Sequence, residues 1–252
     1  MADLDRVLAA ARVDAEVFAL RPDYRVLLVA VDGIEPAPGD ELSRRVLLAA
    51  EESARAAVAE PRPVEELPHV ASWRAAYRAF GAKPQRTRNS AEALLRRAAS
   101  SGLPRVNRLT DIYNAVSVIH QVPLGGEDLA RYVGAPLLRR ATGGEPFETT
   151  ASGSPVVEHP DPGEVVWCDE AGVTCRRWNW RQTTRTQLTD HTTSALFILD
   201  ALDPVTGPAL EAVADDLVGH LARLGADVRV ARRTITGPGA AGPSTSTSAE
   251  GA

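Results

Sequence analysis

Apolar residues recur at helical spacing through the first half of this chain and in short runs between turns through the second half, with the change near Pro123. A helix stripe and a strand face can each be buried only against another element, so both kinds must share a core. The sequence therefore predicts an α+β or mixed α/β fold.

The expected elements follow the apolar residues and the residues that start and stop helices. The run from Tyr24 to Val31 ends at Asp32-Gly33 and is typical of a buried strand. Asn89 or Ser90 is placed to cap one helix, and Asn107 or Thr110 another. Helices are predicted over 41–58, 72–80, 90–101, 107–121 and 208–224, and strands over 24–31, 164–168, 173–178, 192–199 and 226–233.

The composition is that of a globular protein, with 44% hydrophobic and 24% charged residues. Without an internal repeat or a long linker, we expect a single domain over residues 1–236, followed by a disordered Gly/Pro/Ser/Thr/Ala-rich tail over 237–252. The absence of a long apolar run and the acidic start predict no membrane segment and a cytoplasmic location. Cys168 and Cys175 are too few for a structural zinc site or a disulfide framework, and we expect no metal and no cofactor.

The positive charge is concentrated in one segment. The chain has a net charge of -5, but residues 72–108 hold nine cations and one acid, Glu92, so this segment carries +8 and the remainder -13. Local charge of this kind favours a polyanion partner, because phosphate contacts supply affinity independent of sequence. The alternative is a solvated face paired with acids elsewhere. The cations are Arg74, Arg78, Lys83, Arg86, Arg88, Arg96, Arg97, Arg105 and Arg108.

Two further segments are unusual. On the helix predicted from residue 107, polar residues recur at spacings of three and four, and they are Asn107, Asp111, Asn114, Ser117 and Gln121. Short hydrogen-bonding side chains of this kind suit a cleft wall or a buried network, although a polar helix face is usually solvated.

The second segment, residues 175–186, holds two tryptophans and four arginines. Strand alternation predicts Arg177, Asn179 and Arg181 on one face and Trp178 and Trp180 on the other. Indole and guanidinium planes stack on bases or on a substrate side chain, so this segment is a candidate binding surface. The alternative places the tryptophans in the core and the arginines outside.

These stretches together resemble a known family. The resemblance rests on Ser72-Trp73-Arg74, Tyr77, Phe80-Gly81 and residues 88–97, then on 103–107, 109–114, 163–167 and 175–182. In this order they are similar to the B3/B4 domain of the phenylalanyl-tRNA synthetase β subunit, and most of all to its freestanding members, over roughly residues 10–233. The resemblance implies an α+β fold with an unusual β-sandwich of mixed sheets flanked by helices. It also implies a tRNA-editing role without ligase activity, in which the ester of a wrong amino acid on tRNA is hydrolysed in trans.

The implied site joins the resemblance to the segments above. Asp111, Asn114, Glu145 and Glu164 are the candidate catalytic residues. The candidate substrate-binding residues are Asn107, Trp178, Asn179, Trp180, Arg181 and Gln182. The candidate RNA-binding residues are Arg74, Arg78, Arg86, Arg88, Arg96, Arg97 and Arg177. The expected partner is the aminoacylated acceptor end of tRNA, and no DNA partner is expected.

The chain departs from the synthetase at two places. Residues 178–182 stand where the synthetase has a Gly-rich segment with an editing glutamate, and Leu124-Gly125-Gly126 stands where it has a histidine. Two alternatives therefore stay open, a non-catalytic tRNA-binding module and a small-molecule amino-acid-binding protein. The sequence leaves the amino acid, the tRNA and the oligomeric state undetermined.

Overall fold

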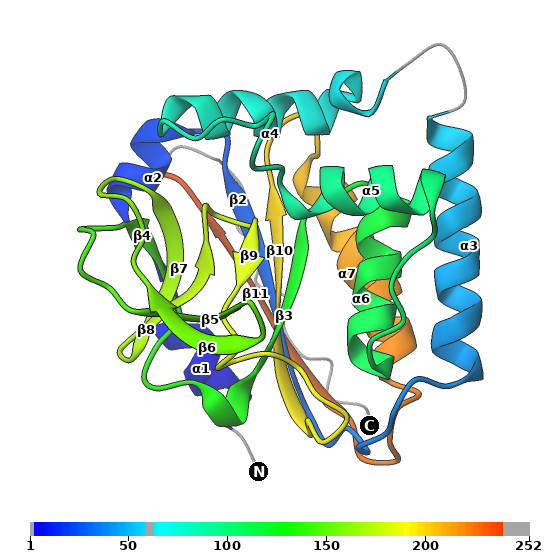
Figure 1. Ribbon diagram of the computed structural model, residues 1–252. Coiled ribbons are helices and arrows are strands. Elements are labelled where there is room, and N and C mark those ends of the chain that lie inside the picture. The colour runs from blue at the N-terminus through cyan, green and yellow to red at the C-terminus, as the bar shows by residue number, and fades with distance from the viewer. Residues whose placement is uncertain (1–2, 59–62, 239–252) are drawn as a thin grey trace.

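The computed structural model describes residues 3–58 and 63–238, and Figure 1 shows helices packed beside a β-sandwich. The described residues form seven α-helices and eleven strands, which confirms the α+β class. Along the same residues, no helix is both long and apolar enough to cross a bilayer.

A four-stranded antiparallel sheet forms the centre of the fold, in the order β11-β2-β10-β3. Its strands are β2 (Arg25–Asp32), β3 (Leu124–Asp128), β10 (Ser194–Ala201) and β11 (Arg229–Thr236). β2 and β10 pair along their full length, from Arg25 opposite Ala201 to Asp32 opposite Ser194. The predicted strands over 24–31, 192–199 and 226–233 are therefore confirmed, with shifts of one to three residues at their ends.

Both faces of the central sheet are covered, which is why β2 is a continuous apolar run. Leu27, Val29 and Val31 face a core shared with α6 and α7. The alternate residues of β2, such as Val26 and Leu28, face a second core shared with the other sheet. Successive side chains of a strand point to opposite faces, so one strand supplies both cores.

The second sheet has the order β1-β4-β7-β8-β9. Its strands are β1 (Arg12–Val13), β4 (Leu137–Arg140), β7 (Val165–Asp169), β8 (Gly172–Arg176) and β9 (Arg181–Gln182). Leu138, Val165 and Trp167 of this sheet pack on the central one, and this contact makes the sandwich. The predicted hairpin is confirmed as β7 and β8, while β5 (Phe147–Ala151) and β6 (Ser154–Glu158) form a separate two-stranded ribbon.

The helices are α1 (Leu4–Ala10), α2 (Ala15–Leu20), α3 (Glu41–Ala57), α4 (Pro68–Ala79), α5 (Ser90–Ser100), α6 (Arg108–His120) and α7 (Gly207–Leu221), with 3-10 turns η1 (Val64–Glu66) and η2 (Leu129–Arg131). In Figure 1, α3, α5, α6 and α7 lie on one side of the central sheet, α4 lies above it, and α1 and α2 lie on the side of the second sheet. The predicted caps are confirmed, since the side chains of Asn89 and Asn107 accept backbone N–H groups of α5 and α6 at 2.9 and 2.8 Å. α4 begins at Pro68, one turn before the predicted start, in a position where proline is well tolerated.

Strand β3 was not among the predicted elements, because its sequence contains Gly125 and Gly126, which weaken a strand pattern. A Cβ at Gly126 would lie 2.7 Å from Leu188 and 2.9 Å from Phe197, so only glycine fits this close approach. At the other end of the chain, Gly237 and Pro238 follow β11, and the rest of the expected tail lies outside the described residues. The extent of the single domain stays a prediction.

Candidate active site

A cavity of about 260 Å³ lies where the two sheets meet α5 and α6. Its floor comes from β3 and β10 of the central sheet, and its walls come from α5, from α6 and from the segment around the β8–β9 connection. The lining residues are Ser90, Ala93, Leu94, Tyr113, Asn114, Leu124, Gly125, Glu127, Trp167, Cys175, Trp178, Asn179, Trp180, Arg181, Gln182, Ile198 and Asp200.

Two buried carboxylates line this cavity. Glu127 on β3 is 1% exposed and Asp200 on β10 is 2% exposed. Asp200 accepts hydrogen bonds from the Tyr24 hydroxyl at 2.6 Å and from Nδ2 of Asn179 at 3.3 Å. Burial raises the pKa of each carboxyl to about 7. Both groups therefore change charge near neutral pH, as a general acid or base requires.

One wall of the cavity is a tight turn formed by residues 177–180. The prediction that residues 177–181 alternate between the two faces of a strand is therefore wrong. Arg177 and Trp178 adopt left-handed backbone conformations with φ of 47° and 68°, so β8 ends at Arg176 and residues 177–180 reverse direction. The N–H of Trp178 donates to the carbonyl of Val165 at 2.6 Å, which fixes the turn on β7. A large side chain with positive φ is unfavourable, and strain of this kind is concentrated at functional sites.

The turn separates the two tryptophans. Trp178 is fully buried beside Tyr24 and Trp73, with ring centroids 4.9 and 5.3 Å away, and only part of it borders the cavity. Trp180 is partly buried, and the guanidinium of Arg177 stacks on its ring at 4.5 Å. Trp180 is therefore the indole better placed to contact a ligand.

Asn179 connects the turn to three other elements. Its Oδ1 accepts from the Tyr77 hydroxyl of α4 at 2.9 Å, and its Nδ2 donates to Asp200. Its carbonyl accepts the N–H of Ser90, the first residue of α5, at 2.9 Å. Gln182 is fixed in turn by donating to the carbonyl of Gly126 at 2.5 Å. The polar wall of the cavity is thus held rigidly by its neighbours.

Of the polar face predicted on α6, only Asn114 lines the cavity. Its amide is buried and makes no hydrogen bond to any residue in the described ranges, so it is free for a ligand. Asn107 caps the helix and donates to the carbonyl of Leu188 at 3.1 Å. Asp111 accepts the N–H of Val106 at 2.8 Å, and burial raises its pKa, but neither residue lines the cavity.

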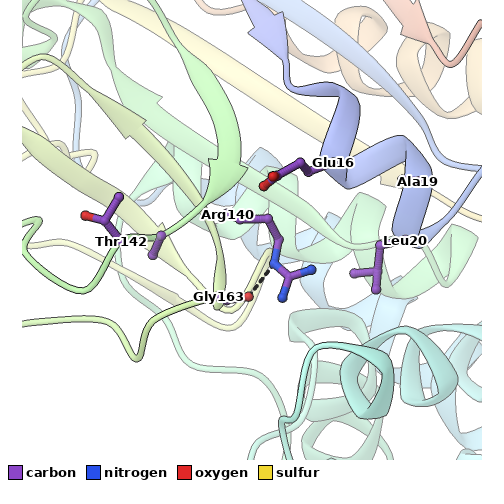
Figure 2. Close-up of a pocket in the computed structure, with 7 residues that line it drawn as sticks. Glu16, Ala19, Leu20, Arg140, Thr142 and Gly163 are labelled. Atoms are coloured by element: carbon purple, nitrogen blue, oxygen red, sulfur yellow. Dashed lines mark hydrogen bonds between the residues drawn. The ribbon is translucent and has the colours of Figure 1, made fainter.

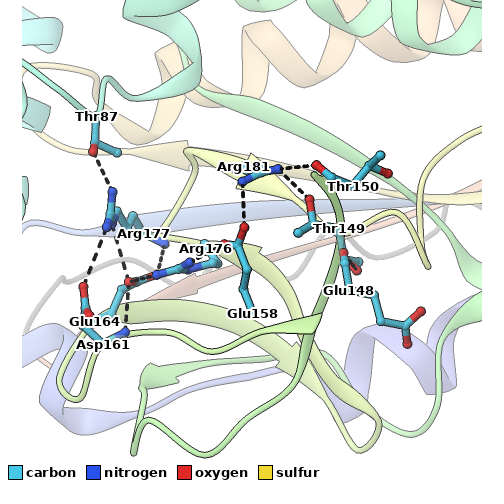
Figure 3. A network of polar contacts seen from close by, with 11 residues as sticks. Thr87, Glu148, Thr149, Thr150, Glu158, Asp161, Glu164, Arg176, Arg177 and Arg181 are labelled. Atoms are coloured by element: carbon cyan, nitrogen blue, oxygen red, sulfur yellow. Dashed lines mark hydrogen bonds and ion pairs between the residues drawn. The ribbon is translucent and has the colours of Figure 1, made fainter. Parts of the chain in front are cut away.

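Glu145 and Glu164 also lie outside the cavity lining. Glu145 pairs with Arg139 at 2.7 Å, and although burial raises its pKa, hydrogen bonds from Thr142 and Gly143 lower the pKa to about 2. Glu164 accepts two bonds from Arg176, at 3.0 and 2.9 Å, and the N–H of Arg177 at 3.0 Å. Figure 3 shows this network reaching Arg181 of β9, and Glu158 and Thr149 of the β5–β6 ribbon. Through the N–H of Arg177, this network holds the turn of residues 177–180 in place.

The cationic segment divides into two parts. Arg74, Arg96 and Arg88 converge on Oε1 of Glu92, which is fully buried, at 2.8, 3.1 and 3.6 Å. Arg105 pairs with Glu51, and the guanidinium of Arg97 donates to the carbonyl of Gly102. The exposed cations of this segment that make neither an ion pair nor a side-chain hydrogen bond with any described residue are Arg78, Lys83 and Arg86, and we call these three the basic patch.

The residues of the basic patch directly precede, in the sequence, a segment that lines the cavity. The patch covers the end of α4 and the loop to Ser90, which itself lines the cavity. Thr87 of this loop accepts from Arg177 at 2.6 Å, so loop and turn are in direct contact (Figure 3).

Sequence reasoning missed Glu127, Asp200, Tyr113 and Ser90 as cavity residues. The sequence does carry a signal for Asp200, because this acid directly follows the apolar run 195–199 with no turn residue before it, and it is therefore part of the strand. Glu127 follows two glycines, which obscured the strand that carries it. A buried acid inside an apolar strand is rare unless it is paired, and this is the pattern to look for.

A second hollow of about 640 Å³ is open to solvent between α2, the end of β4 and the loop that holds Gly163. Figure 2 shows Arg140 projecting into it, with Nε donating to the carbonyl of Gly163 at 2.5 Å, and Glu16 and Leu20 of α2 on the facing side. None of the residues predicted for the site lines it.

Among residues 3–58 and 63–238, no three His, Cys, Asp or Glu side chains are grouped as metal ligands.

Comparison with known proteins gives a family. No curated protein matches this chain in sequence. Among the similar solved structures is an N-terminal fragment of the phenylalanyl-tRNA synthetase β-subunit from Pyrococcus horikoshii, at 12% identity and a TM-score of 0.44. The similarity covers 86% of this chain and 49% of that one, so the chain spans about half the length of the fragment. The sequence model of the B3/4 domain matches residues 72–210, which is more than half of the chain and includes the turn and both cavity carboxylates, and the chain therefore belongs to the B3/4 domain family.

Proposed function

We propose that this protein hydrolyses the ester bond of a mischarged aminoacyl-tRNA, with the amino acid in the 260 Å³ cavity and the tRNA outside it. The observation that carries the proposal is the position of two buried carboxylates and a free amide in one cavity beside an exposed basic patch. Family membership supports a function connected with tRNA.

The size of the cavity favours an amino acid as its occupant. Sites for drug-sized ligands usually measure about 300–1,000 Å³, and this cavity lies below that range. A nucleotide would therefore remain at the mouth, where Trp180 offers a ring for stacking and the cations of the basic patch can contact phosphates.

The chemistry required is modest, because an aminoacyl ester is already activated. Asp200, with a pKa of about 7, is suited to take a proton from a water molecule as the water oxygen attacks the ester carbonyl carbon. The amide of Asn114 is the candidate donor to the oxyanion. The acyl–oxygen bond then breaks, the ribose oxygen receives the proton, and free amino acid and uncharged tRNA leave.

The test is deacylation of a panel of mischarged tRNAs. Asp200→Asn is expected to lower the rate by about 100-fold or more, since general-base catalysis contributes roughly 10²–10⁴. Asp190→Asn, a matched change at an exposed position, should leave the rate unchanged. Equal rates for the two variants would remove Asp200 from the mechanism.

The two alternatives give different results in the same experiment. Tight tRNA binding without release of any amino acid would support a non-catalytic tRNA-binding module. Binding of a free amino acid without any affinity for tRNA would support an amino-acid-binding protein. The free Asn114 amide and the buried carboxylates fit all three functions, whereas the basic patch favours the two that involve tRNA.

A further inference from the structure

Five carboxylates with buried side chains in this arginine-rich chain are paired with arginine, with a guanidinium nitrogen 2.7 to 2.9 Å from the carboxylate. The pairs are Glu51 with Arg105, Glu92 with Arg74, Glu145 with Arg139, Glu164 with Arg176, and Asp169 with Arg185. Pairing of this kind is what burial of a charge demands, since an isolated buried carboxylate is costly.

Glu127 has no arginine partner and accepts no backbone N–H of a described residue, whereas the buried Asp111 and Asp128, which also lack arginine, each accept a backbone N–H. Glu127 is 1% exposed, makes no ion pair with any described residue, and leaves Oε2 without a hydrogen-bond partner among them. The hydroxyls of Tyr132 and Thr174 donate to it. Arg185, whose charge acts on Glu127, is bound through both terminal nitrogens to Asp169, at 2.9 and 2.7 Å. Arg181 also lines the cavity, but it pairs with Glu158 and not with Glu127.

Asp200 is the second acid of the cavity, and it too makes no ion pair with any residue in the described ranges. Its partners, Tyr24 and Asn179, are neutral. Two buried acids share one cavity, and neither of them is paired with a cation of the described residues. A ligand that brings one positive charge would supply what arginine supplies elsewhere in this chain.

We propose that Glu127 binds the free α-ammonium group of the ligand, so that the cavity accepts aminoacyl groups with an unblocked amine and rejects N-acylated or peptidyl groups. This inference rests on the proposed function. The α-ammonium is favoured over a side-chain cation because it is one carbon from the ester carbonyl, and both must fit in the same small cavity as Asp200 and Asn114.

The experiment is calorimetric binding to the full chain, without tRNA and without turnover. The probes are L-amino acid amides, which carry an α-ammonium group, no carboxylate and no ester, and the Nα-acetyl form of each. We expect at least one amide to bind and its acetylated form to bind about tenfold or more weakly, since a hydrogen bond to a charged group contributes that much. Glu127→Gln should lose the same factor for the amide, while Glu148→Gln, a matched change at an exposed position of β5, should not.

Three results would overturn the inference. They are equal binding of the amide and its acetylated form, unchanged affinity in a folded Glu127→Gln variant, and binding of Nα-acetyl-lysine amide in preference to amides with a free α-amine. Should Glu127→Gln not fold, the comparison of each amide with its acetylated form on the wild-type protein still tests the inference. Failure of the binding test together with deacylation of mischarged tRNA would reject this inference alone, whereas specific binding of amides without deacylation would reject the proposed function alone.

Discussion

Replacing Glu127 by glutamine is expected to stabilise the unliganded protein at neutral and alkaline pH. The carboxyl has a pKa of about 7 in the folded chain and 4.5 as a model value. Between these values the folded state holds a proton that the unfolded state has lost, so stability falls as the pH rises from about 4.5 to 7. Glutamine has a similar shape and does not ionise, so it removes this dependence.

The magnitude follows from the size of the shift. One pKa unit corresponds to about 1.4 kcal/mol, so the gain in unfolding free energy at pH 8 is on the order of 3 kcal/mol. In a protein of this size such a gain raises Tm by about 6 to 12 °C. At pH 4 the carboxyl is protonated in both states, and the gain should disappear.

The assay is urea unfolding of wild type and Glu127→Gln from pH 4 to pH 8, followed by tryptophan fluorescence. The set of variants must also contain a change at Asp200, because the charge of Glu127 contributes to the raised pKa of Asp200. The double variant with Asp200→Asn should therefore show non-additive stabilisation at pH 8. If the free energies of unfolding of wild type and Glu127→Gln differ by the same amount at every pH, the argument is refuted.

Three further predictions follow from the fold and from the charges around it. Burial is the main cause that lowers the pKa of His69 to about 4 in the folded chain, from a model value of 6.5. The folded state therefore holds His69 neutral, and this contribution to stability is lost as the pH falls from 6.5 to 4. In urea unfolding, the stability advantage of wild type over His69→Gln should shrink by roughly 3 kcal/mol between pH 7 and pH 4. Glu92→Gln leaves Arg74 and Arg96 without their buried carboxylate and should cost about 3 kcal/mol in the same assay, against less than about 1 kcal/mol for a change at the exposed Glu41–Arg44 pair. Substituting all three cations of the basic patch by alanine should weaken tRNA binding and reduce its log–log salt dependence by about 2 to 3, and an unchanged slope in filter binding would remove the patch from the interface.

The parts of the site that could be predicted are those set by local sequence. Asn89 and Asn107 cap helices because a short side chain next to an apolar-periodic segment is the local signal for a helix start. The segment around Trp178 stood out by composition alone, and it does form a wall of the cavity.

The parts that could not be predicted depend on long-range contacts. Glu92 attracts Arg74 from 18 residues away, which turns an apparent basic face into a buried ion-pair cluster. The left-handed turn at Arg177 and Trp178 replaces strand alternation, because its backbone is held by the carbonyl of Val165 on β7. The burial of Glu127 follows from the second sheet covering β3, and periodicity within β3 carries no information about that.

The hydrogen bonds of Asn179 have a consequence for how this protein folds. One side chain and one carbonyl of Asn179 join α4, α5 and β10, and the most distant partner along the sequence, Tyr77, is 102 residues away. The polar wall exists only when all three elements are in place. Competence to bind therefore depends on their joint assembly, and the amide of Ser90 is expected to be protected from exchange with solvent while they stay assembled.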